Sequence, residues 1–300
     1  MNKFAIYTAC IGGYDNILQP EVTDERFDYF LFTNDVKEEK VGVWQVQKVE
    51  YTNPDMTRIA RYVKTHPEEL LPEYEATLWM DANVQIISTW VYERFIELYE
   101  QGTRVACIQH PERDCIYDEA YKVSSYTIFG ALEHEKIALV WCRKIWKEKY
   151  PMHRGLYETN ILYRKKTSLV KNVNNTWWKC INKYSKRDQL SFNYSLWKNG
   201  IVENCYFLPE GEHAQNSSNV KYISHQHVSQ RKQIRLNLFE RIRYRYKSIQ
   251  PERSILLWND LITSSMPISF ALMFETIVSI GVVFLYKTKK LLCRRTKRHI

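Results

Sequence analysis

The sequence predicts an α/β protein built around a mainly parallel sheet, and three observations lead to this prediction. Short apolar runs rich in β-branched and aromatic residues alternate with segments of helical periodicity. Polar residues and glycines follow the apolar runs, as is typical of the carboxyl ends of strands in open α/β sheets. The composition, 45% hydrophobic and 26% charged over 300 residues, excludes a largely disordered chain.

Each element has a local reason. The runs 3–9 and 28–33 are largely apolar, as in buried strands, whereas 43–50 alternates and indicates a half-exposed strand. Asp55 is placed to cap a helix over 55–66. A strand over 75–80 follows, which 84–87 continues, and then a helix over 90–101 and a strand over 104–108. Two further helices, over 130–149 and 187–198, flank an apolar stretch at 160–164.

The distribution of charge divides the chain into two parts. The net charge of +9 at first suggests a nucleic-acid-binding protein. Residues 1–230, however, hold 28 Lys and Arg against 30 Asp and Glu, a net charge of −2, whereas 231–300 hold 15 against 4, a net charge of +11. We therefore expect one α/β domain over 1–230 followed by a basic tail over 231–300, and no nucleic-acid partner.

Cysteine usage and the N-terminal residues indicate an intracellular protein. The seven cysteines are odd in number, widely spaced and include no C-x-x-C, which argues against a disulfide framework and a zinc site. The apolar run Phe4–Tyr7 is too short for the core of a secretory signal. We expect the 1–230 domain to lie in the cytosol.

The first predicted strand ends in a candidate nucleotide-binding segment, residues 8–15. The adjacent Gly12 and Gly13 permit a tight turn or a close approach of the backbone to a ligand. Ligands of open α/β sheets bind at this end of the strands. The candidate nucleotide contacts in this segment are Thr8, Gly12, Tyr14 and Asp15.

Asp81 and Asn83 form a candidate metal site directly after the strand 75–80. Side chains at i and i+2 point the same way on extended backbone, so both oxygens could face one hard cation. Such a cation would neutralise a diphosphate and help it leave. Many turns carry D-x-N without a metal, so the motif alone leaves a structural turn as the alternative.

The helix 55–66 carries a cationic stripe. Arg58, Arg61 and Lys64 lie at i, i+3 and i+6, which places them roughly on one face. Such a stripe beside a metal would suit a diphosphate. A solvated helix face is the alternative, and the spacing does not decide between them.

Two further pairs have both a functional and a structural interpretation. Asp188 and Gln189 open the predicted helix 187–198, where an aspartate is favoured simply by the helix dipole. His225 and His227 face one way on an extended chain. Imidazole is a common metal ligand, although most isolated histidines are not ligands.

Several runs, taken together, resemble a known family. They are YTACIGGYDN (7–16), FDYFLFTND (27–35), RIARYVKTHPEELLPEYEATLWMDANVQI (58–86), HPERDCIYDEA (110–120), GLYETNILYRK (155–165) and KYSKRDQLSFNYSLWK (183–198). They resemble the glycosyltransferase-like family first catalogued as a domain of unknown function, which has members in bacteria and among plant mucilage and cell-wall proteins. The resemblance covers 3–230 in order and implies a GT-A type fold with a nucleotide-sugar site at the strand ends.

The chain is also similar to GT-A enzymes more widely, especially the retaining family that includes glycogenin, and this similarity implies a metal site. There, a D-x-D motif and a later histidine bind Mn²⁺. Asp81 and Asn83 match the D-x-D, and His225 or His227 matches the histidine, so the expected cofactor is Mn²⁺ or Mg²⁺. Asn83 departs from the motif: its amide oxygen can ligate but adds no charge.

The same similarity implies donor and catalytic contacts. Arg58, Arg61 and Lys64 match the donor-diphosphate helix, Asn160 matches the residue that contacts the donor sugar, and Asp188-Gln189 matches the pair beside the reacting sugar. Retention or inversion stays open. An inverting enzyme needs a carboxylate base near the acceptor hydroxyl, which Asp188, Glu158 or Asp114 could each supply.

The expected function is the transfer of a sugar from a nucleotide-sugar donor, first of all a UDP-sugar, to a glycan or lipid-linked acceptor in surface polysaccharide synthesis. Two alternatives remain. Asn83 allows a catalytically inactive GT-A-like scaffold, and the basic tail allows a nucleic-acid-binding protein, although the sequence contains no such motif.

The tail has the character of a membrane-associating segment. Residues 231–253 are basic with an apolar helical stripe over 235–249, which is typical of a membrane-surface helix or of a helix docked on the domain. Residues 266–286 approach the ~20 apolar residues of a bilayer span. Glu275 and basic residues on both flanks disfavour spanning. We therefore expect a peripheral or monotopic attachment to the anionic cytoplasmic face, with a single span as the alternative.

Overall fold

The computed structural model describes residues 2–13, 15–125, 131–201, 205–223 and 238–296. The chain forms two compact units, each discontinuous in sequence. The first, the sheet unit, comprises Met1–Ile116 and His153–Gln230, and the second, the helical unit, comprises Tyr117–Met152 and Arg231–Ile300. Residues 117–152 belong to the same unit as the tail, because Glu135 shares a buried cluster of ion pairs with the tail helices.

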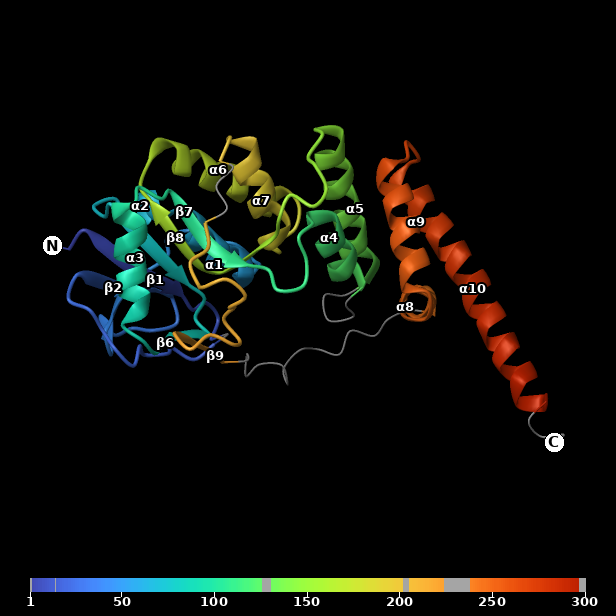
Figure 1. The fold of residues 1–300 in the computed structure, drawn as a ribbon, viewed down its shortest axis with the longest axis horizontal. Helices are drawn as coiled ribbons and strands as arrows, with labels where there is room; N and C mark the ends of the chain where they lie inside the picture. The colour runs from blue at the N-terminus through green and yellow to red at the C-terminus, as the bar shows by residue number, and fades with distance from the viewer. Residues whose placement is uncertain (1, 14, 126–130, 202–204, 224–237, 297–300) are drawn as a thin grey trace. The chain divides into compact units, whose positions relative to one another are not determined.

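The sheet unit contains a seven-stranded sheet in the order β3-β4-β2-β1-β5-β8-β7 (Figure 1). Its strands are β1 (Phe4–Ala9), β2 (Phe27–Phe32), β3 (Lys40–Val41), β4 (Trp44–Gln47), β5 (Ala76–Met80), β7 (Val105–Gln109) and β8 (Tyr157–Lys165). The neighbours β4, β2, β1 and β5 are parallel, whereas β3 and β8 run against their neighbours. The predicted α/β class with a mainly parallel sheet is confirmed.

Helices cover both faces of this sheet (Figure 1). Since side chains alternate along β1, Phe4 and Ile6 pack with α3 (Trp90–Glu100) in one core, and Ala5 and Tyr7 pack with α1 (Met56–Thr65) in the other. This second face is also covered by α6 (Ser168–Lys183) and α7 (Gln189–Lys198), and the short α2 (Pro67–Leu70) follows α1. Asp55 caps α1 as predicted, by accepting from the Thr57 N–H at 3.1 Å.

A second, two-stranded sheet corrects one expectation and positions the candidate site. Residues 84–86 do not continue β5; they form β6 (Val84–Ile86), which pairs antiparallel with β9 (Val220–Tyr222). The Ile223 N–H donates to the Asn83 carbonyl at 2.9 Å. The chain that leads toward His225 and His227 therefore leaves β9 next to Asn83, although both histidines lie outside the described residues.

The helical unit consists of α4 (Ile116–Ser125), α5 (Ala131–Lys147), α8 (Leu238–Ile249), α9 (Pro251–Thr263) and α10 (Ile268–Thr296). Within it, α8 packs along α10, and α5 packs against α9. The Arg143 guanidinium joins α5 to the α9–α10 turn by donating to the Leu261 carbonyl at 2.7 and 2.9 Å and to Ser264 Oγ at 3.0 Å. Among the described residues, the segment Ile268–Lys289 of α10 is the one helix whose length and apolar composition suffice to cross a membrane.

Candidate functional site

The loop after β1 is shaped by its two glycines. Gly12 and Gly13 both have left-handed backbone, with φ of 73° and 58°, and the Gly13 N–H donates to Asp35 Oδ2 at 2.9 Å. Thr8 is buried just before this turn, and its Oγ1 has no hydrogen-bond partner in the described structure. Asp15 follows the turn, and Tyr14 lies outside the described residues.

Asp81 follows β5 at the same edge of the sheet. Its Oδ1 accepts from Trp79 Nε1 at 2.7 Å and lies 3.2 Å from Lys64 Nζ. Its backbone N–H donates to the Asn160 carbonyl of β8 at 2.8 Å, which fixes the turn. Asp81 is partly exposed, so its second oxygen, Oδ2, remains for a ligand. Asn83 is buried, and its Nδ2 finds no partner in the described part of the chain.

The cationic stripe of α1 does not act as a single surface. Lys64 is fully buried, and its ammonium lies 2.7 Å from Asp188 Oδ2 and 3.1 Å from Thr159 Oγ1. Arg61 Nε lies 3.4 Å from the same Asp188 oxygen. Arg58 instead donates to the Ile181 carbonyl of α6. The structure therefore brings Lys64 and Arg61 together at Asp188 and uses Arg58 to attach α1 to α6.

Asp188 combines capping with charge pairing. It is the N-cap of α7, its Oδ1 accepts from the Gln189 N–H at 3.2 Å, and Oδ2 accepts from Thr159 Oγ1 at 2.8 Å. Burial alone would raise the pKa of Asp188, but Arg61 and Lys64 hold it well below the usual carboxyl range. Asp188 is therefore ionised at neutral pH. The adjacent Gln189 has a buried Oε1 without a partner in the described residues.

Glu158 and Asn160 lie at the start of β8, which is antiparallel to β5 and so begins beside Asp81. Asn160 Nδ2 donates to Glu158 Oε2 at 3.4 Å, and Asn160 Oδ1 is buried without a described partner. Burial raises the pKa of Glu158, an effect that His213 and Asn160 partly offset. The two strand-end carboxylates thus differ: Asp188 is held ionised, while Glu158 takes up a proton more readily.

The sequence patterns did not predict several residues of this site. Thr159 and Trp79 bind the charged groups but are concealed within strands, and His213 and Tyr222 come from the segment around β9. His213 acts electrostatically on Glu158, and its Nδ1 is buried without a described partner. The signal available was a histidine within a polar loop, which is common on any protein surface.

Polar atoms without protein partners gather at this edge. They are Thr8 Oγ1, Asn83 Nδ2, Asn160 Oδ1, Gln189 Oε1 and His213 Nδ1. Buried polar groups in folded proteins are nearly always hydrogen-bonded, so a group of exceptions needs an explanation. Next to Asp81, the ionised Asp188 and the basic side chains of Lys64 and Arg61, these atoms can receive the hydroxyl and phosphate groups of a polar ligand.

A Glu158→Gln variant is expected to gain stability over the wild type as the pH rises. Because the pKa of Glu158 is raised, the folded state binds the carboxyl proton more tightly than the unfolded state does. Proton binding by Glu158 therefore stabilises the fold below the ordinary carboxyl pKa, and this stabilisation is lost as the pH rises through the pKa of the folded state. Glutamine cannot ionise and avoids that loss. Urea unfolding of both proteins from pH 4 to 8 measures the difference; curves that stay parallel would contradict the buried, proton-retaining carboxyl.

A model of the TOD1/MUCI70 glycosyltransferase-like domain matches residues 3–208. The chain belongs to this glycosyltransferase-like family. This membership confirms the resemblance found in the sequence. No curated protein matches. Among solved structures, the chain is similar to the apo structure of the WbbM bifunctional glycosyltransferase, with 10% identity, a TM-score of 0.37 and coverage of 69% of this chain and 38% of that one.

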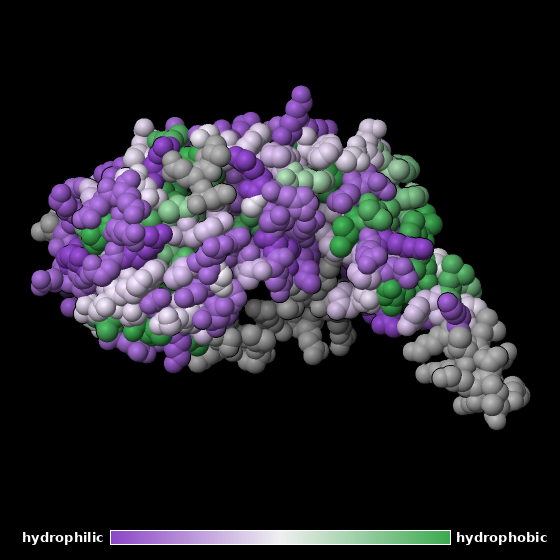
Figure 2. Space-filling view, in the orientation of Figure 1, coloured by the Kyte–Doolittle hydropathy of each residue, from purple (hydrophilic) through white to green (hydrophobic). Residues whose placement is uncertain are grey.

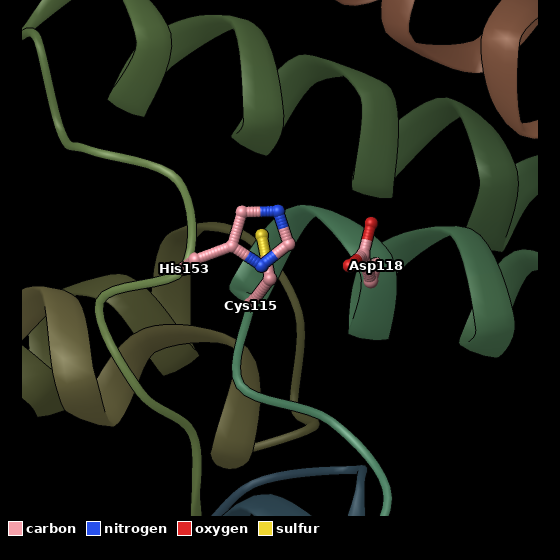
Figure 3. A group of neighbouring side chains, drawn as sticks. All are labelled: Cys115, Asp118 and His153. Atoms are coloured by element: carbon pink, nitrogen blue, oxygen red, sulfur yellow. The ribbon is translucent and has the colours of Figure 1, made fainter.

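A separate group of side chains lies where the chain leaves and re-enters the sheet unit of this TOD1/MUCI70-like protein. Figure 3 shows Cys115 and His153 there, together with Asp118. His153 Nδ1 lies 2.8 Å from Asp114 Oδ1, and both of those side chains are mostly exposed. Asp114 thus pairs with His153, and the candidate base at the strand ends is Glu158 or Asp188.

Proposed function

We propose that this chain transfers a sugar from a nucleotide-sugar donor, first of all a UDP-sugar, to a glycan or lipid-linked acceptor in surface polysaccharide synthesis. The observation that carries the proposal is the charged cluster of Lys64, Asp81 and Asp188 at the carboxyl ends of the strands. The unpartnered amide oxygens of Asn160 and Gln189 lie at the same edge. A sugar diphosphate offers both the charge and the hydroxyl groups that such an edge can bind.

A divalent cation, Mn²⁺ or Mg²⁺, fits this edge as a weakly held cofactor. Asp81 has one oxygen engaged by Lys64 and Trp79, so Oδ2 would hold the ion together with the Asn83 amide. Both are hard oxygen ligands, and only one is charged. Such an ion would neutralise the donor diphosphate as it leaves. His225 or His227 completes the proposed ligand set.

The charge states of the two carboxyls assign them different roles. Transfer breaks the bond between the anomeric carbon and the diphosphate oxygen, joins that carbon to the acceptor oxygen and leaves the acceptor proton to be removed. Asp188, held strongly ionised by Lys64 and Arg61, is a weak base and would instead position the donor sugar with Gln189. Glu158, with its raised pKa, is the better proton acceptor.

Replacing Asp81 with alanine is expected to reduce sugar-nucleotide turnover at least about 100-fold, because it removes the only charged group proposed for the cation. The measurement is nucleotide release from a panel of nucleotide sugars, with and without Mn²⁺. Asp24→Ala is the matched control, since Asp24 pairs with Arg26. Equal rates for the two variants would contradict the assignment of Asp81.

Binding measured by calorimetry, together with the turnover assay, distinguishes the inactive-scaffold alternative from an active enzyme. Calorimetry that detects UDP and Mn²⁺ binding by a wild-type protein without turnover of any nucleotide sugar would favour the scaffold. A wild-type protein that binds none of these ligands would contradict the strand-end site itself.

The proposed place of action is the cytoplasmic face of the membrane, with peripheral or monotopic attachment and lipid-borne acceptors. The support is the apolar character of α10, whose segment Ile268–Lys289 has a mean hydropathy of 2.2. Hydrophobic residues are gathered on the surface of the C-terminal helices (Figure 2). An anionic surface would also attract the basic tail.

A further inference from the structure

The apolar helix α10 buries its acidic residue and exposes large apolar ones. Its buried side includes Glu275 and Ser279, which are 3% and 0% exposed. Its exposed side carries large apolar residues, between 40% and 69% exposed, at helical spacing: Phe270, Met273, Phe274, Ile277, Ile280, Phe284 and Leu285. We call these seven residues the outer stripe. A helix on the surface of a water-soluble domain has the opposite arrangement, so this stripe requires an apolar environment.

A neutral ion-pair cluster explains how Glu275 lies within an apolar helix. Arg243 of α8 lies 2.6 Å from Glu135 Oε2 and also contacts Glu275. Lys247 lies 2.7 Å from Glu135 Oε1 and 3.5 Å from Glu275 Oε1. The two cations balance the two carboxylates when Glu135 is ionised, and burial raises the pKa of Glu135 to about 7. The charge of Glu275 is therefore directed away from the outer stripe.

Basic and aromatic residues border the stripe at its carboxyl end. The Arg245 guanidinium lies 5.7 Å from the ring centroid of Tyr286, and Lys287 and Lys289 follow as exposed residues. Tyrosine and basic side chains of this kind are typical of the headgroup region of a membrane. Their positive charge is complementary to anionic lipid headgroups.

The packing of α8 on α10 disfavours a transmembrane orientation. Arg243 and Lys247 hold α8 against the middle of α10, and Arg245 lies at its Tyr286. If α10 spanned the bilayer, the exposed Arg241, which lies on α8 next to the residues paired with the middle of α10, would be carried to hydrocarbon depth, which is strongly unfavourable. The outer stripe is also only about 22 Å long, from Phe270 to Leu285, against a hydrocarbon thickness of ~30 Å.

We infer that the whole helical unit, 117–152 together with 231–300, is a membrane-docking module in which α10 lies in the plane of the bilayer, its outer stripe in the acyl region and the basic residues of α8 at anionic headgroups. This inference rests on the proposed membrane attachment and adds its geometry. It assigns Glu135 of α5 to the attachment, since Glu135 completes the neutral cluster beneath α10.

Vesicle flotation of the full chain tests this assignment. The probes are vesicles of phosphatidylcholine with and without phosphatidylglycerol, and the variant is Phe274→Ser with Ile277→Ser. We expect the wild type to float better with the anionic vesicles and the variant to bind at least about tenfold more weakly. Leu256→Ser, at a residue of α9 that is at least as exposed, is the matched control and should float as the wild type does.

Each of the other outcomes of the flotation experiment contradicts a different part of the proposal. A wild type that floats with neither vesicle contradicts membrane attachment as well as this geometry. A double variant that floats as well as the wild type, or a control that is equally impaired, overturns the outer stripe alone. Light scattering in vesicle-free buffer that shows a wild-type dimer, a monomeric variant and unchanged flotation would assign the stripe to self-association. Nucleotide release by the double variant reports on the strand-end site separately.

Discussion

Replacing Lys64 with methionine is expected to lower the free energy of unfolding by about 3–5 kcal/mol. Lys64 is fully buried, and its ammonium is shared by Asp188 at 2.7 Å and Asp81 at 3.2 Å. Methionine fills similar volume but leaves Asp188 with Arg61, at 3.4 Å, as its neighbouring cation. A buried carboxylate without its nearest partner is costly, so the loss arises mainly from the groups left behind.

Urea unfolding of the wild type and Lys64→Met at neutral pH measures this effect. Lys3→Met is the matched control, because Lys3 forms an exposed pair with Glu75 and should change stability little. The double variant Lys64→Met, Asp188→Asn removes the stranded charge and should recover part of the loss. Equal stability of Lys64→Met and Lys3→Met would contradict a buried, energetically coupled cluster.

Lys64→Met is also expected to lose turnover under conditions in which the variant is still folded. The ammonium lies between Asp81, the proposed cation ligand, and Asp188, the proposed sugar contact, so both would shift. Nucleotide release measured well below the unfolding midpoint separates this effect from unfolding. A folded variant with wild-type turnover would mean that Lys64 has a structural role only.

The elements that the sequence predicted well are those specified by local pattern. β1, β2 and β5 are continuous apolar runs, and the Asp55 cap of α1 depends on residues two positions apart. In contrast, α6 was not predicted, because its apolar positions Val170, Val173 and Trp177 are separated by polar residues that hide the stripe. Local pattern therefore determines where the strands end, and hence where the site lies.

What the sequence could not predict depends on contacts between distant residues. The equal spacing of Arg58, Arg61 and Lys64 gave no sign that Arg58 would bind α6 while the other two met Asp188. Likewise, no local pattern pairs Glu135 with Lys247, 112 positions later. Both outcomes follow from burial, which requires each charged group to find a hydrogen-bonding or oppositely charged partner wherever the fold supplies one.

Replacing Glu275 with leucine is expected to destabilise the helical unit by about 3–5 kcal/mol, although leucine is far better suited to an apolar helix. Its carboxylate balances Arg243 and Lys247, and its removal leaves two buried cations with Glu135 alone. Pulse proteolysis with trypsin in mild detergent measures the loss, because the basic tail is rich in cleavage sites once it unfolds.

A charge-balanced variant decides whether neutrality or the carboxylate itself matters. Glu275→Leu with Arg243→Leu leaves the Lys247–Glu135 pair at 2.7 Å and a cluster without net charge, so most of the lost stability should return. Glu252→Ala, at an exposed residue of α9, is the control for a surface carboxylate. If Glu275→Leu were as stable as this control, the cluster would not stabilise the unit. If the double variant were less stable than either single variant, the pairs would act separately rather than as one neutral cluster.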